Sequence, residues 1–208
     1  GQIFAGENLG GVQAGVGQKI AFTDPLRKGR EVTTVGGFKC TEPSNRVWMA
    51  GGKLTVSAKA TITAMRCGCL NRAWVEGGCG THYLQGGIYG GKFRGSGETN
   101  AAIPVPYGDA EWPTMVGSCS DLDTKTGVGT GGGAIRLDFA GAVTIDGTVR
   151  ANGTNNKSRT GSGGGILIVC GTISGSGEVL AKPYDPRTDG TTIGAGGGGG
   201  RIAVHYDT

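Results

Sequence analysis

The chain has 208 residues, of which 45 are glycine, with a formal net charge of +4 and 17% charged residues. This length suits one domain and no linker divides it, so we expect a single domain over residues 1–208. No Gly-X-Y period exists, which excludes collagen, and no apolar run approaches the ~18 residues that a membrane-spanning helix needs. The basic residues are scattered, with one cluster at 27–30 that lacks aromatic residues, so nucleic-acid binding is not expected.

Residues 1–50 are expected to form N-terminal strands or a cap. Two short runs have the composition of strands but no glycine tract beside them, and their apolar residues are Ile3, Phe4, Ile20 and Phe22. The first residue is Gly, which indicates a mature or excised form. Glycine interrupts nearly every window of the sequence, so no helix of useful length is predicted and the chain should be all-β.

Residues 51–65 start with two glycines and continue as an alternating apolar strand. A long excursion follows over residues 66–130. It contains four of the six cysteines and most of the aromatic residues, so we expect it to fold as its own cap or lid.

The six cysteines are an even number in a glycine-rich β protein, which favours disulfides and an oxidising compartment. The expected disulfide residues, with unknown pairing, are Cys40, Cys67, Cys69, Cys79, Cys119 and Cys170. Cys67 and Cys69 should not pair with each other, because that ring would be strained. A metal site at Cys67, Cys69 and Cys79 is the alternative, but the Cys-X-Cys spacing is unusual and His82 is the only nearby fourth ligand. We expect no metal and no cofactor.

A glycine tract followed by an apolar strand occurs three times in residues 131–207, at spacings that indicate a repeat architecture. Counting from the last glycine, the second and fourth residues of each strand should face inward. These pairs are Ile135 and Leu137, Leu167 and Val169, and Ile202 and Val204. Polar, aperiodic segments between the copies are expected to be loop excursions.

These features predict a right-handed parallel β-helix, or β-solenoid, with glycine-rich excursions and a cysteine-rich insertion. The glycine tracts allow two interpretations. They could form tight corners that require positive φ, or they could be extended segments packed so closely that no side chain fits.

Several segments together resemble the glycine-rich β-helical repeat regions of large secreted and cell-surface proteins of adhesin-like or matrix-like type. They cover much of residues 51–207 and are 107–118, 131–137, 144–153, 171–177 and 196–204. The resemblance implies the architecture and says little about activity. The cysteines of the long excursion are not part of the pattern.

Two N-glycosylation sequons begin at Asn152 and Asn156 in a polar loop, and with the cysteines they favour a secreted or cell-surface protein. We expect a non-enzymatic extracellular structural or adhesive role, with possible glycan binding. In the expected alignment Asp138, Cys170 and His205 form one outward column, but its order places Cys in the middle, so no catalytic residue is assigned.

The alternative functions are a polysaccharide lyase or hydrolase and a glycan-binding module. An enzyme would use paired carboxylates, although turns explain each candidate equally well. The candidates are Asp109 with Glu111, Asp121 with Asp123, and Asp185 and Asp189 with Arg187. A glycan-binding module would use exposed aromatic residues, namely Trp74, Tyr107 and Trp112.

The same alignment places Ile166 and Ile168 on the outward face of their strand, where they need cover. The N-terminal strands or a neighbouring molecule could supply it. We therefore expect self-association, as an oligomer or a fibre in which the N-terminal strands of one chain complete the last coil of the next.

Overall fold

The computed structural model describes residues 2–4, 19–23, 31–35, 46–68, 87, 89–91, 106–120, 129–156, 159–184 and 196–207. All the regular secondary structure in these residues is β-strand. The strands are β1 (Gln2–Phe4), β2 (Lys19–Thr23), β3 (Glu31–Val35), β4 (Arg46–Gly51), β5 (Leu54–Val56), β6 (Thr61–Thr63), β7 (Ala134–Ile145), β8 (Thr148–Arg150), β9 (Asn155–Asn156), β10 (Arg159–Thr160), β11 (Gly165–Ser174), β12 (Glu178–Leu180) and β13 (Arg201–Tyr206). This part of the chain has no helix long and apolar enough to cross a membrane.

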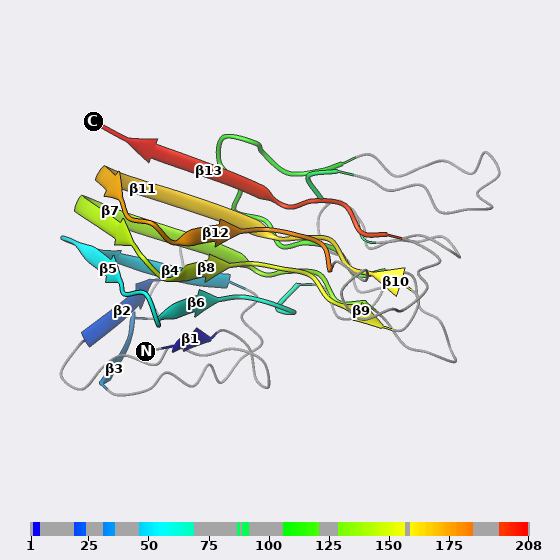
Figure 1. The fold of residues 1–208 in the computed structure, drawn as a ribbon, viewed down its shortest axis with the longest axis horizontal. Coiled ribbons are helices and arrows are strands. Elements are labelled where there is room, and N and C mark those ends of the chain that lie inside the picture. Colours follow the sequence, from blue (N-terminus) through cyan, green and yellow to red (C-terminus); the bar gives the residue numbers. More distant parts are fainter. Residues whose placement is uncertain are drawn as a thin grey trace.

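Two parallel sheets pack face to face. The five-stranded sheet has the order β13-β11-β7-β4, with β5 also paired to β7, and the four-stranded sheet has the order β1-β6-β8-β12. Every pairing within these sheets is parallel. Strands β7, β11 and β13 point in one direction and β6, β8 and β12 in the opposite direction (Figure 1). Each repeat therefore runs out along one sheet and returns along the other.

The prediction of a right-handed parallel β-helix is wrong. The described residues form two parallel sheets and no closed solenoid. Each of these repeats has two strands, and the chain reverses its direction between them. The turns are residues 146–147 between β7 and β8 and residues 175–177 between β11 and β12. Gly175 adopts φ 118° in the second of these turns, a conformation that favours glycine. Beyond the sheets, the described parts of the chain continue as segments without regular strands.

The core lies between the two sheets. Alternating residues of β7 point into it, and Ile135, Leu137 and Val143 are at most 1% exposed. From the opposite sheet, Ile62 of β6 and Val149 of β8 belong to the same buried cluster. The short β-branched runs of the sequence thus become strands because each can bury one apolar face against the other sheet.

The register of β11 corrects the predicted alignment. This strand begins at Gly165, which pairs with Ala134 of β7, so Ile166 lies beside Ile135 and Ile168 beside Leu137. Both isoleucines are fully buried, and the expectation that they face outward is wrong. A slip of one residue moves every side chain of a strand to the other face. Gly165, which the predicted alignment assigns to the glycine tract, is the first residue of β11.

Three rows of segments outside the regular strands, most of which contain glycine, continue the sandwich beyond the strands. The first row precedes β7, β11 and β13, the second follows β6, β8 and β12, and the third comes from residues 87, 89–91 and 116–120. The first and second rows make the same bond in three successive repeats. Backbone N–H groups of Gly133, Gly164 and Gly200 donate to the carbonyls of Ala64, Ala151 and Ala181 at 2.7, 2.7 and 2.8 Å.

The first row also bonds to the third and along its own length. The Gly117 N–H donates to Gly132 O at 2.7 Å, and the Gly198 N–H donates to Gly87 O at 2.7 Å. The Gly132 N–H donates to Ser162 O at 2.9 Å, which joins neighbouring repeats. Backbone groups therefore bond in two directions, unlike those of a sheet. We call residues 64–68, 87, 89–91, 116–120, 129–133, 151–154, 161–164, 181–183 and 196–200 the glycine bundle.

Close backbone contact explains why the bundle needs glycine. A Cβ at Gly132 would overlap the Ala151 carbonyl oxygen, and one at Gly164 would overlap the Gly133 oxygen. Among the described glycines only Gly108 and Gly175 have positive φ, so the tracts are not corners. The close-packing interpretation is correct and the tight-corner interpretation is wrong, since only a residue without a side chain lets backbones approach this closely.

The N-terminal strands pair within their own chain. β1 pairs with β6, with Ile3 beside Ile62, and β2 forms an antiparallel hairpin with β3. β2 lies next to β4 at the edge of the five-stranded sheet (Figure 1). The side chains of Ile3, Phe4, Ile20 and Phe22 lie outside the description.

Candidate functional site

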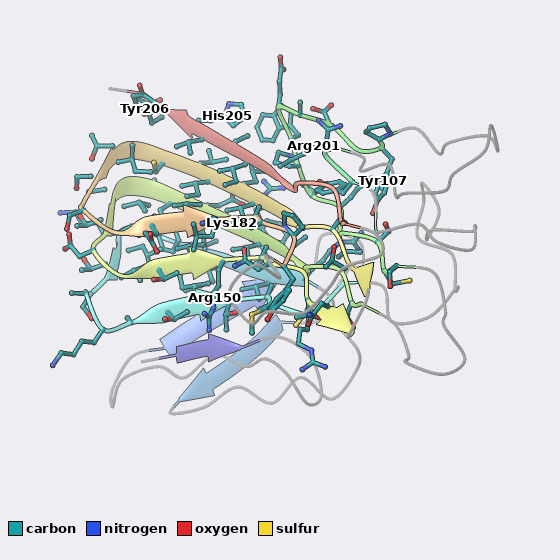
Figure 2. The ribbon with its side chains drawn as sticks, turned by 45° about the vertical axis from the view of Figure 1, so that its right-hand side comes forward. Tyr107, Arg150, Lys182, Arg201, His205 and Tyr206 are labelled. Carbon is teal, nitrogen blue, oxygen red and sulfur yellow. The ribbon has the colours of Figure 1, made fainter. Side chains whose placement is uncertain are left out.

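Residues 106–115, here called the covering segment, cross the outer face of the five-stranded sheet. At β13, Arg201 Nε donates to Tyr107 O at 3.2 Å and His205 Nε2 lies 2.7 Å from Glu111 O. At the opposite edge, Arg46 Nε of β4 donates to Thr114 O at 3.2 Å. The covering segment therefore shields outward-facing residues of β11 and β7, which lie between β13 and β4. Leu167 of β11 is fully buried although it faces away from the core. Figure 2 shows Tyr107, Arg201 and His205 on this side of the molecule.

A charged network lies on the same face next to β4. Asp138 accepts hydrogen bonds from Trp48 Nε1 at 2.5 Å and from Arg136 Nε at 2.7 Å. The Arg136 guanidinium lies 4.7 Å from the centre of the Trp48 ring, within cation–π range. All three side chains are half-buried. The network joins β4 to β7, and its polar groups form hydrogen bonds with each other.

The predicted column of Asp138, Cys170 and His205 does not form. Val169 is the residue of β11 that lies between Asp138 and His205. Cys170 lies instead between Phe139 and Tyr206, one position along the strand and on the opposite face of the sheet. The thiol therefore cannot act together with the carboxylate or the imidazole.

His205 and Trp112 form a stacked pair. The ring centroids are 4.5 Å apart with 14° between the planes, and the indole is 46% exposed. Tyr107, also proposed as a sugar-stacking residue, is half-buried and donates its hydroxyl to Val116 O at 2.6 Å. Trp74 lies outside the described residues. Of the two candidates that are described, the structure thus brings Trp112 to the surface.

The carboxylate pair Asp109 and Glu111 forms a turn. Asp109 Oδ1 accepts the backbone N–H groups of Glu111 at 2.7 Å and of Trp112 at 3.0 Å. Hydrogen bonds from Trp112 and then Glu111 lower the pKa of this carboxyl group. The other carboxylate candidates, Asp121, Asp123, Asp185 and Asp189, and their companion Arg187, lie outside the described residues.

The cysteine prediction can be followed at three positions. Cys170 is a free, buried thiol, so it lacks the disulfide expected there. Burial, and then the Asp207 carboxylate, raise the pKa of this thiol. Cys67 and Cys119 are also buried, and Cys67 Sγ donates to Met65 O at 3.4 Å. Cys40, Cys69, Cys79 and His82 lie outside the described residues, so the pairing of the other five cysteines stays a prediction.

The first sequon lies in the second row of the bundle. Asn152 is half-buried, and its Oδ1 accepts the Lys182 N–H at 2.9 Å, which joins two repeats. Asn156 belongs to β9, and its side chain lies outside the description. Glycosylation at both residues stays a prediction.

The apolar end of the sandwich at β13 is open. Trp112, Ile202 and Tyr206 are the exposed large apolar residues within the described part of the chain, at 46%, 43% and 59%. Two of them lie on β13 and the third stacks on His205 of the same strand. The sequence contained a signal for this, because Ile202, Val204 and Tyr206 alternate after the last tract, but their exposure depends on the strands around them.

No protein-family model, curated protein or solved structure matches this chain.

Proposed function

We propose that this protein is a non-enzymatic structural or adhesive scaffold of the extracellular space. The observation that carries the proposal is the glycine bundle, in which backbone groups bond in two directions and join successive repeats. The Gly132–Ser162 bond and the bond from the Gly163 N–H to Gly198 O run along the stack, while the Gly133–Ala64 bond runs across it. Such a lattice resists deformation along more than one axis.

The location and adhesive character are proposed from the sequence. Six cysteines, two sequons and the resemblance to repeat regions of secreted and cell-surface proteins support an extracellular role. The non-enzymatic character is supported by the described outer face, where Asp138, Arg136 and His205 contact groups of the protein itself.

Mechanical unfolding tests the scaffold role. Single-molecule pulling on the full chain should give a high unfolding force that falls in the Gly164→Ala variant, whose added methyl group overlaps the Gly133 carbonyl. Gly199→Ala is the matched control in the third tract, since nothing lies within 4 Å of its Cβ position. A low force in the unmodified chain, or an equal loss in both variants, would contradict the proposal.

An activity screen tests the absence of catalysis. Release of reducing ends or unsaturated sugars from a panel of acidic and neutral polysaccharides would identify the protein as an enzyme instead. We expect no turnover.

Glycan binding is the second candidate, and the exposed Trp112 favours it. His205 covers one face of the indole, which leaves the other face available to stack on a sugar ring. Tryptophan fluorescence titrated with oligosaccharides should show saturable quenching that Trp112→Ala abolishes. A titration without saturation would exclude this function.

A further inference from the structure

We propose that the free edge of β13 is an interface between two copies of this chain. The strands pair antiparallel over residues 201–207 about a two-fold axis at Val204. The inference rests on the scaffold role proposed above and adds its partner. It replaces the expected head-to-tail contact through the N-terminal strands.

Register partners on the core side of the five-stranded sheet form apolar columns that run from strand to strand. The exposure of their members shows where the core is not covered. Along one column Val47, Ile135 and Ile166 are 3%, 1% and 0% exposed, and the next member, Ile202, is 43% exposed. In the neighbouring column Ile168 is fully buried and Val204 is only half-buried. The opening is therefore confined to the β13 end of the stack.

The backbone of β13 offers alternate hydrogen-bonding groups at this edge. The Arg201 N–H donates to Gly164 O at 3.0 Å and the Asp207 N–H donates to Gly171 O at 3.0 Å, so odd-numbered residues bond toward β11. In a strand the groups of the intervening residues point the other way. The N–H and C=O groups of Ile202, Val204 and Tyr206 therefore point outward, and β13 pairs with β11 alone within the described residues.

The edge is complementary to itself. With Val204 opposite its own copy, Ile202 faces Tyr206 of the second copy, and all outward-pointing backbone groups meet as hydrogen-bonded pairs. The pairing places an aromatic side chain opposite a β-branched one on the core side, a favourable combination. On the outer side it places Arg201 opposite Asp207 of the second copy, so opposite charges meet twice about the axis.

The opposite end of the stack does not offer a matching surface. Val47 and Met49 of β4 are only 3% and 5% exposed, and β2 lies beside that strand (Figure 1). β1 already pairs with β6. A second β13 edge therefore suits the open end better than the N-terminal strands of another molecule.

Charge reversal and mixing test this register. In sedimentation at micromolar concentration the unmodified chain should be a dimer. Arg201→Glu and Asp207→Arg should each weaken the dimer by about tenfold, because each brings like charges together twice. Arg201→Glu also loses its bond to Tyr107 O, so a melting curve of each variant verifies that the monomer is folded. Mixing the two variants should restore dimers, since a heterodimer regains both opposite-charge pairs. Failure of the mixture to recover would overturn the proposed register.

A backbone variant tests the edge itself. Val204→Pro removes an N–H that points away from β11, so the fold should persist and melt as before while the dimer is lost. A monomeric unmodified chain, fibres in place of dimers, or a dimer that persists in Val204→Pro would each overturn the inference. A monomer would leave the mechanical test of the scaffold role unaffected, so the two proposals can fail separately.

Discussion

Ile166 of β11 and Ile202 of β13 are register partners, yet Ile166 has no exposed surface and Ile202 is 43% exposed. The difference follows from the order of the strands. β7 and β11 are each followed by a strand of the four-stranded sheet that covers their inward side chains, and no described strand covers β13.

The two isoleucines should respond differently to truncation. Ile166→Ala leaves a cavity in a closed core and should lower the free energy of unfolding by about 3 to 4 kcal/mol. Ile202→Ala removes a side chain that is already partly in water, so the monomer should lose less than about 2 kcal/mol. Urea denaturation at low protein concentration measures both. Equal losses would show that the end at β13 is covered.

The glycine bundle should tolerate a methyl group only where space exists. Gly164→Ala forces two backbones apart and should destabilise the fold by at least ~2 kcal/mol, the cost typical of overpacking. Gly199→Ala, in an open position, should leave the melting temperature unchanged or raise it slightly. Thermal unfolding of the two variants shows whether these glycines belong to a packed bundle or to a flexible loop. In a flexible loop neither substitution would lower the melting temperature.

The network at Asp138 should couple β4 to β7. Asp138→Asn weakens two hydrogen bonds to a charged acceptor and should cost about 1.5 to 3 kcal/mol. Trp48→Phe should lower the free energy of unfolding less in the Asp138→Asn background than in the unmodified chain, because the acceptor of the Trp48 hydrogen bond is already altered there. Additive losses in this double-mutant cycle would mean that the short Trp48 contact contributes nothing.

Tyr89 should make the fold sensitive to alkaline pH. Burial raises the pKa of Tyr89 to about 12, from an ordinary value of 10. Between these values the unfolded chain loses the proton and the folded chain keeps it, so stability is present below pH ~10 and falls by up to ~1.4 kcal/mol per pH unit above it. Tyr89→Phe should reduce this dependence without abolishing it, because burial also raises the pKa of Tyr107.

Tyr107→Phe is the comparison for that change: burial raises the pKa of this phenol as well, so both variants should reduce the alkaline dependence, and they should differ at neutral pH. The Tyr89 hydroxyl is buried and has no close hydrogen-bond partner among the described residues, with only a weak contribution from the Met115 backbone, so its removal should cost little at neutral pH. Tyr107 loses its bond to Val116 O and should be destabilised at neutral pH. Guanidinium denaturation at pH 7 and pH 11 separates the two, and an unchanged alkaline slope in Tyr89→Phe would contradict the assignment.

Cys170 should react with alkylating agents only after unfolding. The thiol is buried and its pKa is raised, so it holds little thiolate at pH 8 and is hidden from the reagent. Mass spectrometry of tryptic peptides, after labelling in and out of denaturant without reductant, measures this. A peptide that labels only after reduction would place Cys170 in a disulfide.

The sequence predicts the strands well because β-branched runs between glycines have few alternatives. It does not determine the register of β11, since residues 166–169 are all apolar and either phase buries two of them. Gly165 has no side chain to indicate whether it belongs to the tract or to the strand. The structure settles this through pairing with Ala134, a residue about thirty positions away in the sequence.

The sequence also does not predict the path of the chain beyond the strands. Glycine tracts carry no periodicity, so the sequence does not distinguish a corner from a bundle, nor a closed coil from a chain that doubles back. The covering segment depends on contacts such as Arg46 with Thr114 and Arg201 with Tyr107, which join residues far apart in sequence. Local patterns contain no information about such pairs.

The bundle also limits how the protein can change during evolution. In a side-chain core, an enlarged residue can be accommodated when a neighbour shrinks, as volume-conserving exchanges show. At Gly132 or Gly164 the neighbour is a carbonyl group, which every amino acid has. No second substitution at the contacted position can restore the space, so suppressors of bundle mutations should be absent at those contacts, whereas suppressors of core mutations should be common.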